Sequence, residues 1–302
     1  MNLQKAYDVI IVGGSFAGLS AAMSLGRALR SVLVIDGGSP CNRQTPFTHN
    51  FLTQDGQSPQ HITETGKAQV LKYPTVSFCE GMAVSGMQTA DGFEIETQQG
   101  EIFKAKKLIF CTGIADQMLP IPGFSDCWGI SVLHCPFCHG YEVISETTAL
   151  LGKGNTGFGL CRLISNWSKN VVLFTNGASD LSEEQASKIA GRKIQLVETE
   201  IDHLEHENGY LQKIVLNDGS HWKVNAMYAP VPFKQHCDIP ASLGCNFDEH
   251  GYIDTDEFRR TSVPGVYAAG DNITTYRAVS YAVSSGSIAG ITCSKDLIED
   301  EF

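Results

Sequence analysis

Hydrophobic positions near the start of the chain predict a strand, a tight turn, a helix and a second strand. Residues 7–12 (YDVIIV) are mostly apolar, and residues 13–18 (GGSFAG) place glycines where the chain must turn. The apolar positions that follow fit a helix to about residue 29, and the apolar run 32–35 ends at Asp36. This order predicts a βαβ unit.

The same order of elements recurs later in the chain. Residues 148–151 (TALL) predict a strand, and residues 152–157 (GKGNTG) repeat the glycine turn. A helix to about Trp167 then leads to a strand at residues 171–174. Two such units predict an α/β fold with two Rossmann-like dinucleotide-binding domains.

Prolines and the C-terminal pattern indicate that the second domain is inserted into the first. Pro120 and Pro122 form a hinge-like stretch before the second unit, and Pro230 and Pro232 mark a second crossing after it. The last segment carries no third glycine turn of this kind, so we expect it to return to the first domain. The predicted boundaries are residues 1–114 and 233–302 for the first domain and residues 115–232 for the second.

Charge and hydrophobicity narrow the classes of partner. The chain has 22 Lys and Arg against 33 Asp and Glu, a formal net charge of −11, which repels phosphate backbones and anionic lipid surfaces. No apolar run approaches the roughly 20 residues that a membrane helix needs. We therefore expect neither nucleic acid nor a membrane as a partner.

Cysteine usage points to one local pair. Of ten cysteines, only Cys135 and Cys138 stand close together in the sequence, and no secretory signal pattern precedes them. A reducing cytoplasm fits this usage, because a close pair there is more often catalytic or metal-binding than structural.

The segment HCPFCH, residues 134–139, allows several kinds of chemistry. A redox-active pair would exchange disulfides with a thiol partner. The motif also spells the attachment site of c-type haem, which would require export. Zinc ligation by His134, Cys135, Cys138 and His139 is disfavoured because four ligands within six residues can hardly surround a tetrahedral ion, so we expect no metal. An inert structural pair is the third rival. The flanking imidazoles favour redox chemistry, since a group with a pKa of about 6.5 exchanges protons at neutral pH.

The first glycine turn fits a dinucleotide. Backbone N–H groups at the start of the helix can meet a pyrophosphate, and Asp36 at the end of the next strand can accept a ribose hydroxyl. Ser15 replaces the second glycine of the pattern, which loosens the approach to the phosphate. The distant Gly270-Asp271 turn strengthens the dinucleotide interpretation.

These motifs together resemble the low-molecular-weight thioredoxin reductase family of FAD enzymes. The matching segments are 13–18 with Asp36, 111–113 (CTG), 135–138 (CPFC) and 261–271 (TSVPGVYAAGD). The resemblance implies an FAD-binding first domain, an NAD(P)H-binding-like second domain with the cysteine pair, and a homodimer. It also implies that Cys138 faces the flavin while Cys135 exchanges with substrate.

The resemblance also nominates cofactor contacts. The implied FAD contacts are Gly13, Gly14, Ser15, Phe16, Ala17, Gly18, Asp36, Asn50, Thr112, Gly113, Gly270, Asp271, Arg277 and Ala278. His49 is a further candidate beside the flavin. The implied contacts for NADPH or NADH are Gly152, Gly154 and Gly157.

Two departures from the family pattern concern proton and hydride donors. His139 stands where thioredoxin reductases carry an aspartate, so we expect His134 or His139 to handle protons, although each could be a structural histidine. The run 134–142 (HCPFCHGYE) is more similar to the gliotoxin- and holomycin-type dithiol oxidases of this superfamily. No Lys or Arg occurs from residue 170 to 187, where the family places an arginine clamp for the 2′-phosphate of NADPH.

We therefore predict a flavoprotein dithiol/disulfide oxidoreductase without ordinary NADPH dependence. Two electrons would pass between FAD and the Cys135–Cys138 disulfide, and then to or from a thioredoxin-like protein or a small dithiol. Three alternatives stay open: an oxygen-dependent dithiol oxidase that produces hydrogen peroxide, a ferredoxin- or NAD(P)H-dependent thioredoxin reductase, and a flavin-binding redox sensor with little turnover.

Overall fold

The computed structural model describes residues 6–302, which divide into two compact units. The first unit takes in residues up to 43, residues 51–115 and residues 233–302. The second takes in residues 44–50 and 116–232. Residues 44–50, which the sequence analysis assigned to the first domain, thus make their contacts in the second unit.

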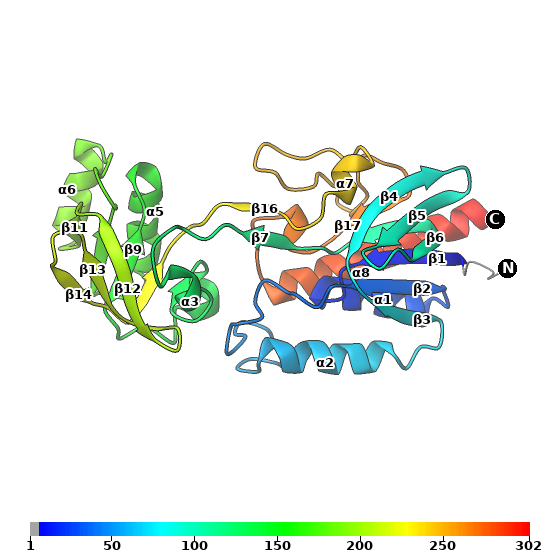
Figure 1. Cartoon of the computed structure of the whole chain (residues 1–302), viewed down its shortest axis with the longest axis horizontal. Helices are drawn as coiled ribbons and strands as arrows, with labels where there is room; N and C mark the ends of the chain where they lie inside the picture. Colours follow the sequence, from blue (N-terminus) through cyan, green and yellow to red (C-terminus); the bar gives the residue numbers. More distant parts are fainter. Residues whose placement is uncertain (1–5) are drawn as a thin grey trace. The chain divides into compact units, whose positions relative to one another are not determined.

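A seven-stranded sheet forms the centre of the first unit (Figure 1). Its order is β3-β2-β1-β6-β5-β4, and β17 pairs with the end of β6. The pairs among β3, β2, β1, β6 and β17 are parallel, whereas β4, β5 and β6 form an antiparallel meander. The strands are β1 Ala6–Val12, β2 Val32–Asp36, β3 Val76–Glu80, β4 Ala83–Thr89, β5 Gly92–Thr97, β6 Ile102–Phe110 and β17 Val266–Ala268.

The central strand β1 is buried on both faces. Val9 and Ile11 face the core beneath the helices, while Ile10 and Val12 face the core on the other side. This two-sided burial explains the continuous apolar run, which is typical of parallel strands. The helices of the first unit are α1 Phe16–Arg27, α2 Pro59–Val70, α7 Ile239–Ser242, α8 Val279–Glu301 and the 3-10 turn η1 Asp271–Ile273.

Helices α1 and α8 pack side by side against one face of this sheet (Figure 1). A Cβ atom added at Gly290 of α8 would lie 2.7 Å from the carbonyl oxygen of Ala21 in α1. The Ser20 hydroxyl donates to the carbonyl of Val283 at 2.7 Å. Small residues on α8 therefore let the two backbones approach closely, and this contact holds α1 against α8.

The second unit repeats the parallel-sheet design on a smaller scale. Its main sheet has the order β11-β10-β9-β15-β8, and a three-stranded antiparallel sheet, β12-β13-β14, accompanies it. Val172 and Phe174 of β10 face one core, whereas Val171 and Leu173 face the other. The strands are β8 Val132–Leu133, β9 Thr148–Leu151, β10 Val171–Phe174, β11 Gln195–Val197, β12 Ile201–Glu207, β13 Tyr210–Leu216, β14 His221–Lys223 and β15 Ala226–Tyr228.

Short helices complete the second unit, and two strands mark its connections. The helices are α3 Phe124–Cys127, α4 Pro136–His139, α5 Gly154–Ile164 and α6 Glu183–Gly191. The connecting strands β7 Ile114–Asp116 and β16 Phe233–Gln235 pair with each other. Within residues 6–302, no helix combines the length and apolar character required to cross a bilayer.

Candidate active site

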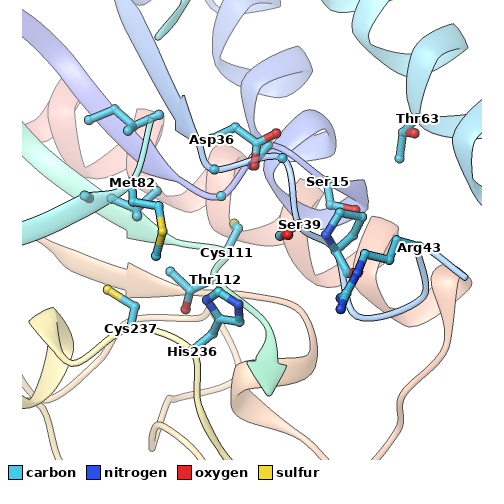
Figure 2. Close-up of a pocket in the computed structure, with 18 of the residues that line it drawn as sticks. Ser15, Asp36, Ser39, Arg43, Thr63, Met82, Cys111, Thr112, His236 and Cys237 are labelled. Atoms are coloured by element: carbon cyan, nitrogen blue, oxygen red, sulfur yellow. The ribbon is translucent and has the colours of Figure 1, made fainter. Parts of the chain in front are cut away.

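The first unit contains a cavity of about 410 Å³ at the carboxyl ends of its parallel strands. Every residue that lines it belongs to this unit. Figure 2 shows Asp36 and Ser15 on one side of the cavity, Cys111 and Thr112 below them, and His236 and Cys237 on the opposite side. The open α/β sheet thus places its cavity where such sheets generally bind ligands.

The first glycine turn forms the wall of this cavity around Asp36. The backbone N–H of Gly14 donates to Oδ1 of Asp36 at 3.1 Å, and a Cβ atom on Gly14 would lie 2.8 Å from the Asp36 Cβ. Helix α1 begins at Phe16, and neither a side-chain cap nor an acidic residue occupies its first turn. This helix end favours an anion, and Asp36 suits a ribose hydroxyl, so the residues fit the pyrophosphate and ribose of a dinucleotide.

The turn after β17 is fixed against the same wall. Gly270 has a φ of +96°, donates its N–H to the Ser285 hydroxyl at 3.0 Å, and would place a Cβ atom 3.1 Å from that of Ala17. The buried Asn272 donates through Nδ2 to the carbonyl of Phe110 at 2.9 Å. Through these contacts Gly270 and Asp271 are held next to α1 and to the end of β6.

Most of the predicted FAD residues gather in this unit. Asp271 accepts a hydrogen bond from the Cys41 thiol, with 3.8 Å between Sγ and Oδ2. Arg277 and Ala278 directly precede α8, and Ala278 is its N-cap. Asn50 belongs instead to the second unit. Sequence reasoning missed Cys41, Asn272, His236 and Cys237, which no motif singles out.

Cys135 and Cys138 form a disulfide in the second unit, with 5.4 Å between their Cα atoms. Cys135 is the N-cap of α4, and the N–H groups of Cys138 and His139 donate to its carbonyl at 3.3 and 3.2 Å. Both cysteines are half-buried. The Phe137 ring packs edge-on against Trp167, with 5.1 Å between ring centroids. The short helical turn therefore leaves the pair accessible while fixing its backbone.

Four buried cysteines outside the pair are poorly suited to thiolate chemistry. Burial raises the pKa of Cys127 and of Cys161 to about 11, and it raises the pKa of Cys111 and Cys293 as well. The thiolate is the reactive form, so these thiols are inert near neutral pH. Within residues 6–302, no group of three or more His, Cys, Asp or Glu side chains is placed to hold a metal ion.

The two histidines that flank the disulfide have different surroundings. His134 is exposed, and its ring lies 6.1 Å from the ring of Trp128. The half-buried His139 lies edge-on to His49, with 6.4 Å between ring centroids. Burial lowers the pKa of His139, the carboxylate of Glu142 raises it, and the charge of His49 lowers it. The protonation of His139 thus depends on Glu142 and His49 as well as on its burial.

The second glycine turn keeps its packing role, but its surroundings do not fit a nucleotide. Gly157 must be glycine because a Cβ atom there would lie 2.9 Å from the carbonyl carbon of Gly152. The N–H of Gly154, however, donates to the carbonyl of Ser179 at 2.8 Å. The N–H groups of Gly177 and Ser179 in turn donate to Glu198, at 2.9 and 2.8 Å. The chain's own loop therefore uses a donor that a nicotinamide dinucleotide would need.

Comparison with known proteins identifies the family. Residues 7–286 match the model of the pyridine nucleotide-disulphide oxidoreductase family. The chain belongs to this family. It is similar to thioredoxin reductase tcpT of Claviceps purpurea (strain 20.1), with 31% identity over 317 residues that cover 99% of this chain and 97% of the relative.

Solved structures agree with this assignment. A putative thioredoxin reductase TrxB from Bacillus anthracis has a TM-score of 0.94 and 29% identity, covering 98% of this chain and all of the other. The crystal structure of HlmI has a TM-score of 0.92 and 29% identity, covering 98% of this chain and 94% of the other.

The comparisons confirm the predicted family resemblance and the α/β fold with two Rossmann-like domains. They also confirm that the protein is an FAD-dependent disulfide oxidoreductase of the thioredoxin reductase-like kind. The family implies FAD and a nicotinamide nucleotide as cofactors. The cavity of the first unit fits the dinucleotide part of FAD, whereas the second glycine turn does not fit the nicotinamide cofactor.

Proposed function

We propose that the protein exchanges electron pairs between FAD and the Cys135–Cys138 pair, and between that pair and a thiol or disulfide substrate, without an ordinary NADPH-dependent step. The observation that carries this proposal is the hydrogen bond from Gly154 to Ser179, which engages a phosphate donor of the second glycine turn. The absence of Lys and Arg from residues 170–187 adds to it. The substrate is a thioredoxin-like protein or a small dithiol.

The FAD would be held by the first glycine turn, Asp36 and the turn at Gly270 and Asp271. When bound, FAD supplies a two-electron carrier for the cysteine pair. Glycine at position 14 leaves room next to Asp36 because it has no side chain. Its backbone N–H orients Asp36 by donating a hydrogen bond to the carboxylate. Arg277 and Ala278 at the start of α8 are the remaining contacts in this proposal.

Thiol exchange at the disulfide follows from the arrangement of α4. A substrate thiolate forms a bond to Sγ of Cys135, the Cys135–Cys138 bond breaks, and Cys138 leaves with the electron pair. His139 supplies the proton that Cys138 takes up. A second substrate thiolate then displaces Cys135, which is also protonated. The substrate loses two electrons and two protons, and the protein gains them as two thiols.

A second candidate is the oxygen-dependent dithiol oxidase, in which a dithiol and oxygen yield a disulfide and hydrogen peroxide. The observation that favours this direction is the engaged Gly154 donor, because it does not suit entry of electrons from NADPH. If the enzyme instead works as a reductase of disulfide substrates, we propose that ferredoxin is its electron donor. A homodimer in the cytoplasm is the expected setting.

The test is anaerobic flavin absorbance during sequential addition of NADPH, NADH and dithiothreitol, followed by air. We expect bleaching by the dithiol alone. Fast return of colour with hydrogen peroxide would support the oxidase, and slow return would favour ferredoxin. Rapid bleaching by NADPH would contradict the proposal.

Cysteine variants test the assigned pair. Cys135→Ser and Cys138→Ser should retain FAD but lose dithiol-driven bleaching by more than about a hundredfold, because exchange requires both sulfurs. Cys79→Ser, which changes a partly exposed cysteine in the other unit, is the matched control and should keep wild-type rates. Full activity in both active-site variants would remove the pair from the mechanism.

A further inference from the structure

His139 is tied to the disulfide by the backbone of α4. It directly follows Cys138, and its N–H donates to the carbonyl of Cys135 at 3.2 Å. Its imidazole is half-buried, so its protonation depends on the few groups that face it. Those groups, Glu142 and His49, come from two different parts of the second unit.

Glu142 and His49 form a pair beside His139. Nε2 of His49 lies 3.5 Å from Oε1 of Glu142, and the exposed fractions of the two side chains are 21% and 39%. The His49 ring lies edge-on to that of His139, with 6.4 Å between centroids. The segment 44–50 thus brings one imidazole to another imidazole and to a carboxylate that lie some 90 residues away in sequence.

No stronger cation competes for Glu142. Within residues 6–302, Glu142 forms no ion pair with Lys or Arg, so an imidazolium is the cation available to it. The charge of Glu142 also acts on Tyr228 of β15, whose buried hydroxyl has no hydrogen-bond partner among the described residues. Burial and the charge of Glu142 both raise the pKa of Tyr228, so it stays a neutral phenol.

We propose that Glu142 and His49 are positioning residues that set how firmly His139 holds the proton it gives to Cys138. The inference rests on the proposed thiol exchange. Glu142 stabilises an imidazolium on His139, whereas His49, when protonated, competes for the same carboxylate and repels a second charge. The step itself is the one described above: the disulfide bond breaks, Cys138 leaves as a thiolate, and the His139 proton moves to its sulfur.

The proposal predicts opposite effects of two substitutions. Glu142→Gln removes the favourable charge and should lower the pKa of His139, whereas His49→Gln removes the unfavourable one and should raise it. The shift expected for a partly exposed charge is about half a pH unit in each direction. The charged groups that act on His139 are Glu142 on its own segment and His49 on residues 44–50, and Glu142 in turn acts on Tyr228 of β15.

The experiment measures the pKa of His139 by proton NMR titration of the oxidised protein. The His139 signal is assigned by its loss in His139→Gln. In parallel, the rate of disulfide reduction by dithiothreitol is followed against pH by alkylation and mass spectrometry, which does not depend on the flavin. The high-pH fall in rate should move to lower pH in Glu142→Gln and to higher pH in His49→Gln. Glu142→Asp keeps the charge and should restore most of the wild-type profile.

Two control variants match the charge and the residue type. Glu146→Gln changes an exposed carboxylate four residues along, and His203→Gln changes a histidine that pairs with Asp202 on β12. Both should leave the His139 titration unchanged. Shifts in the same direction, or no shift, in Glu142→Gln and His49→Gln would overturn the proposal. If instead the Cys135 and Cys138 serine variants keep full exchange, the proposed function itself fails.

Discussion

The N–H of Gly154 donates to the carbonyl of Ser179 at 2.8 Å, so a glycine of the second nucleotide-type turn is bonded to the chain itself. Gly152 and Gly157 still pack in direct contact, which explains why the glycine pattern survives. In the function proposed above, the second unit keeps the fold of a dinucleotide domain without ordinary nicotinamide binding. By contrast, the corresponding glycine turn of the first unit, around Gly14 and Asp36, borders an open cavity.

Nicotinamide nucleotides should bind weakly to the oxidised protein. Because the Gly154 donor is engaged and no Lys or Arg lies between residues 170 and 187, we expect a Kd above about 1 mM for both NADPH and NADH. Isothermal titration calorimetry measures this directly. A Kd in the micromolar range for either nucleotide would mean that the 175–180 loop opens readily.

Asp36 should contribute strongly to FAD affinity. Asp36→Asn weakens the hydrogen bond from Gly14 and the acceptor proposed for the ribose, and we expect FAD binding about 10- to 100-fold weaker. Flavin fluorescence released on dilution measures the affinity. Asp91→Asn, at an exposed hairpin turn, is the control and should bind FAD as the wild type does. Equal affinity in both variants would exclude Asp36 from the FAD site.

Two glycines of α5 should respond oppositely to alanine. Gly157→Ala forces a Cβ atom against the Gly152 backbone and should lower the free energy of unfolding by about 1 to 3 kcal/mol. Gly159 faces open space, so Gly159→Ala should raise it by about 0.5 to 1 kcal/mol through helix propensity. Tryptophan fluorescence during urea denaturation reports on this unit, because Trp128, Trp167 and Trp222 all lie in it. Destabilisation by both substitutions would contradict this account.

Asp296 should stabilise the first unit above acidic pH. Arg260 donates to both of its carboxylate oxygens at 2.7 and 2.8 Å, and the Tyr267 hydroxyl donates at 2.6 Å. The hydrogen bonds from Arg260 hold the pKa of Asp296 below its usual value of 3.8. The stabilisation is therefore fully present above that value and is lost as the pH falls through the lower, folded-state pKa.

Asp296→Asn tests this stabilisation. Its free energy of unfolding should be about 1 to 3 kcal/mol lower than that of the wild type near pH 7, and this difference should shrink toward about pH 3. Urea denaturation followed by circular dichroism at several pH values measures the difference. Glu299→Gln on the exposed side of α8 should change little. A loss in Asp296→Asn that does not depend on pH would point to packing instead of charge.

Local sequence was sufficient to predict the repeated strand–turn–helix units and the cysteine pair. β1 and β9 occur where the apolar runs predicted them, because a strand buried on both faces needs a continuous apolar run. The end of α1 differs from the prediction: the helix ends at Arg27, whereas the pattern predicts about residue 29, and Leu29 adopts a φ of +61°. Pairs such as Cys135 and Cys138 are visible in sequence because their chemistry depends on short spacing.

Tertiary structure alone decided which distant side chains meet. The sequence offered His134 and His139 equally, and only the packing of residues 44–50 brought His49 to His139 and to Glu142. The sequence also presented an intact second glycine turn, while the contact between Gly154 and Ser179 depends on how a loop some 25 residues away folds back. Periodicity and motif spacing describe neighbours along the chain, whereas these contacts arise from long-range packing, which no local pattern specifies.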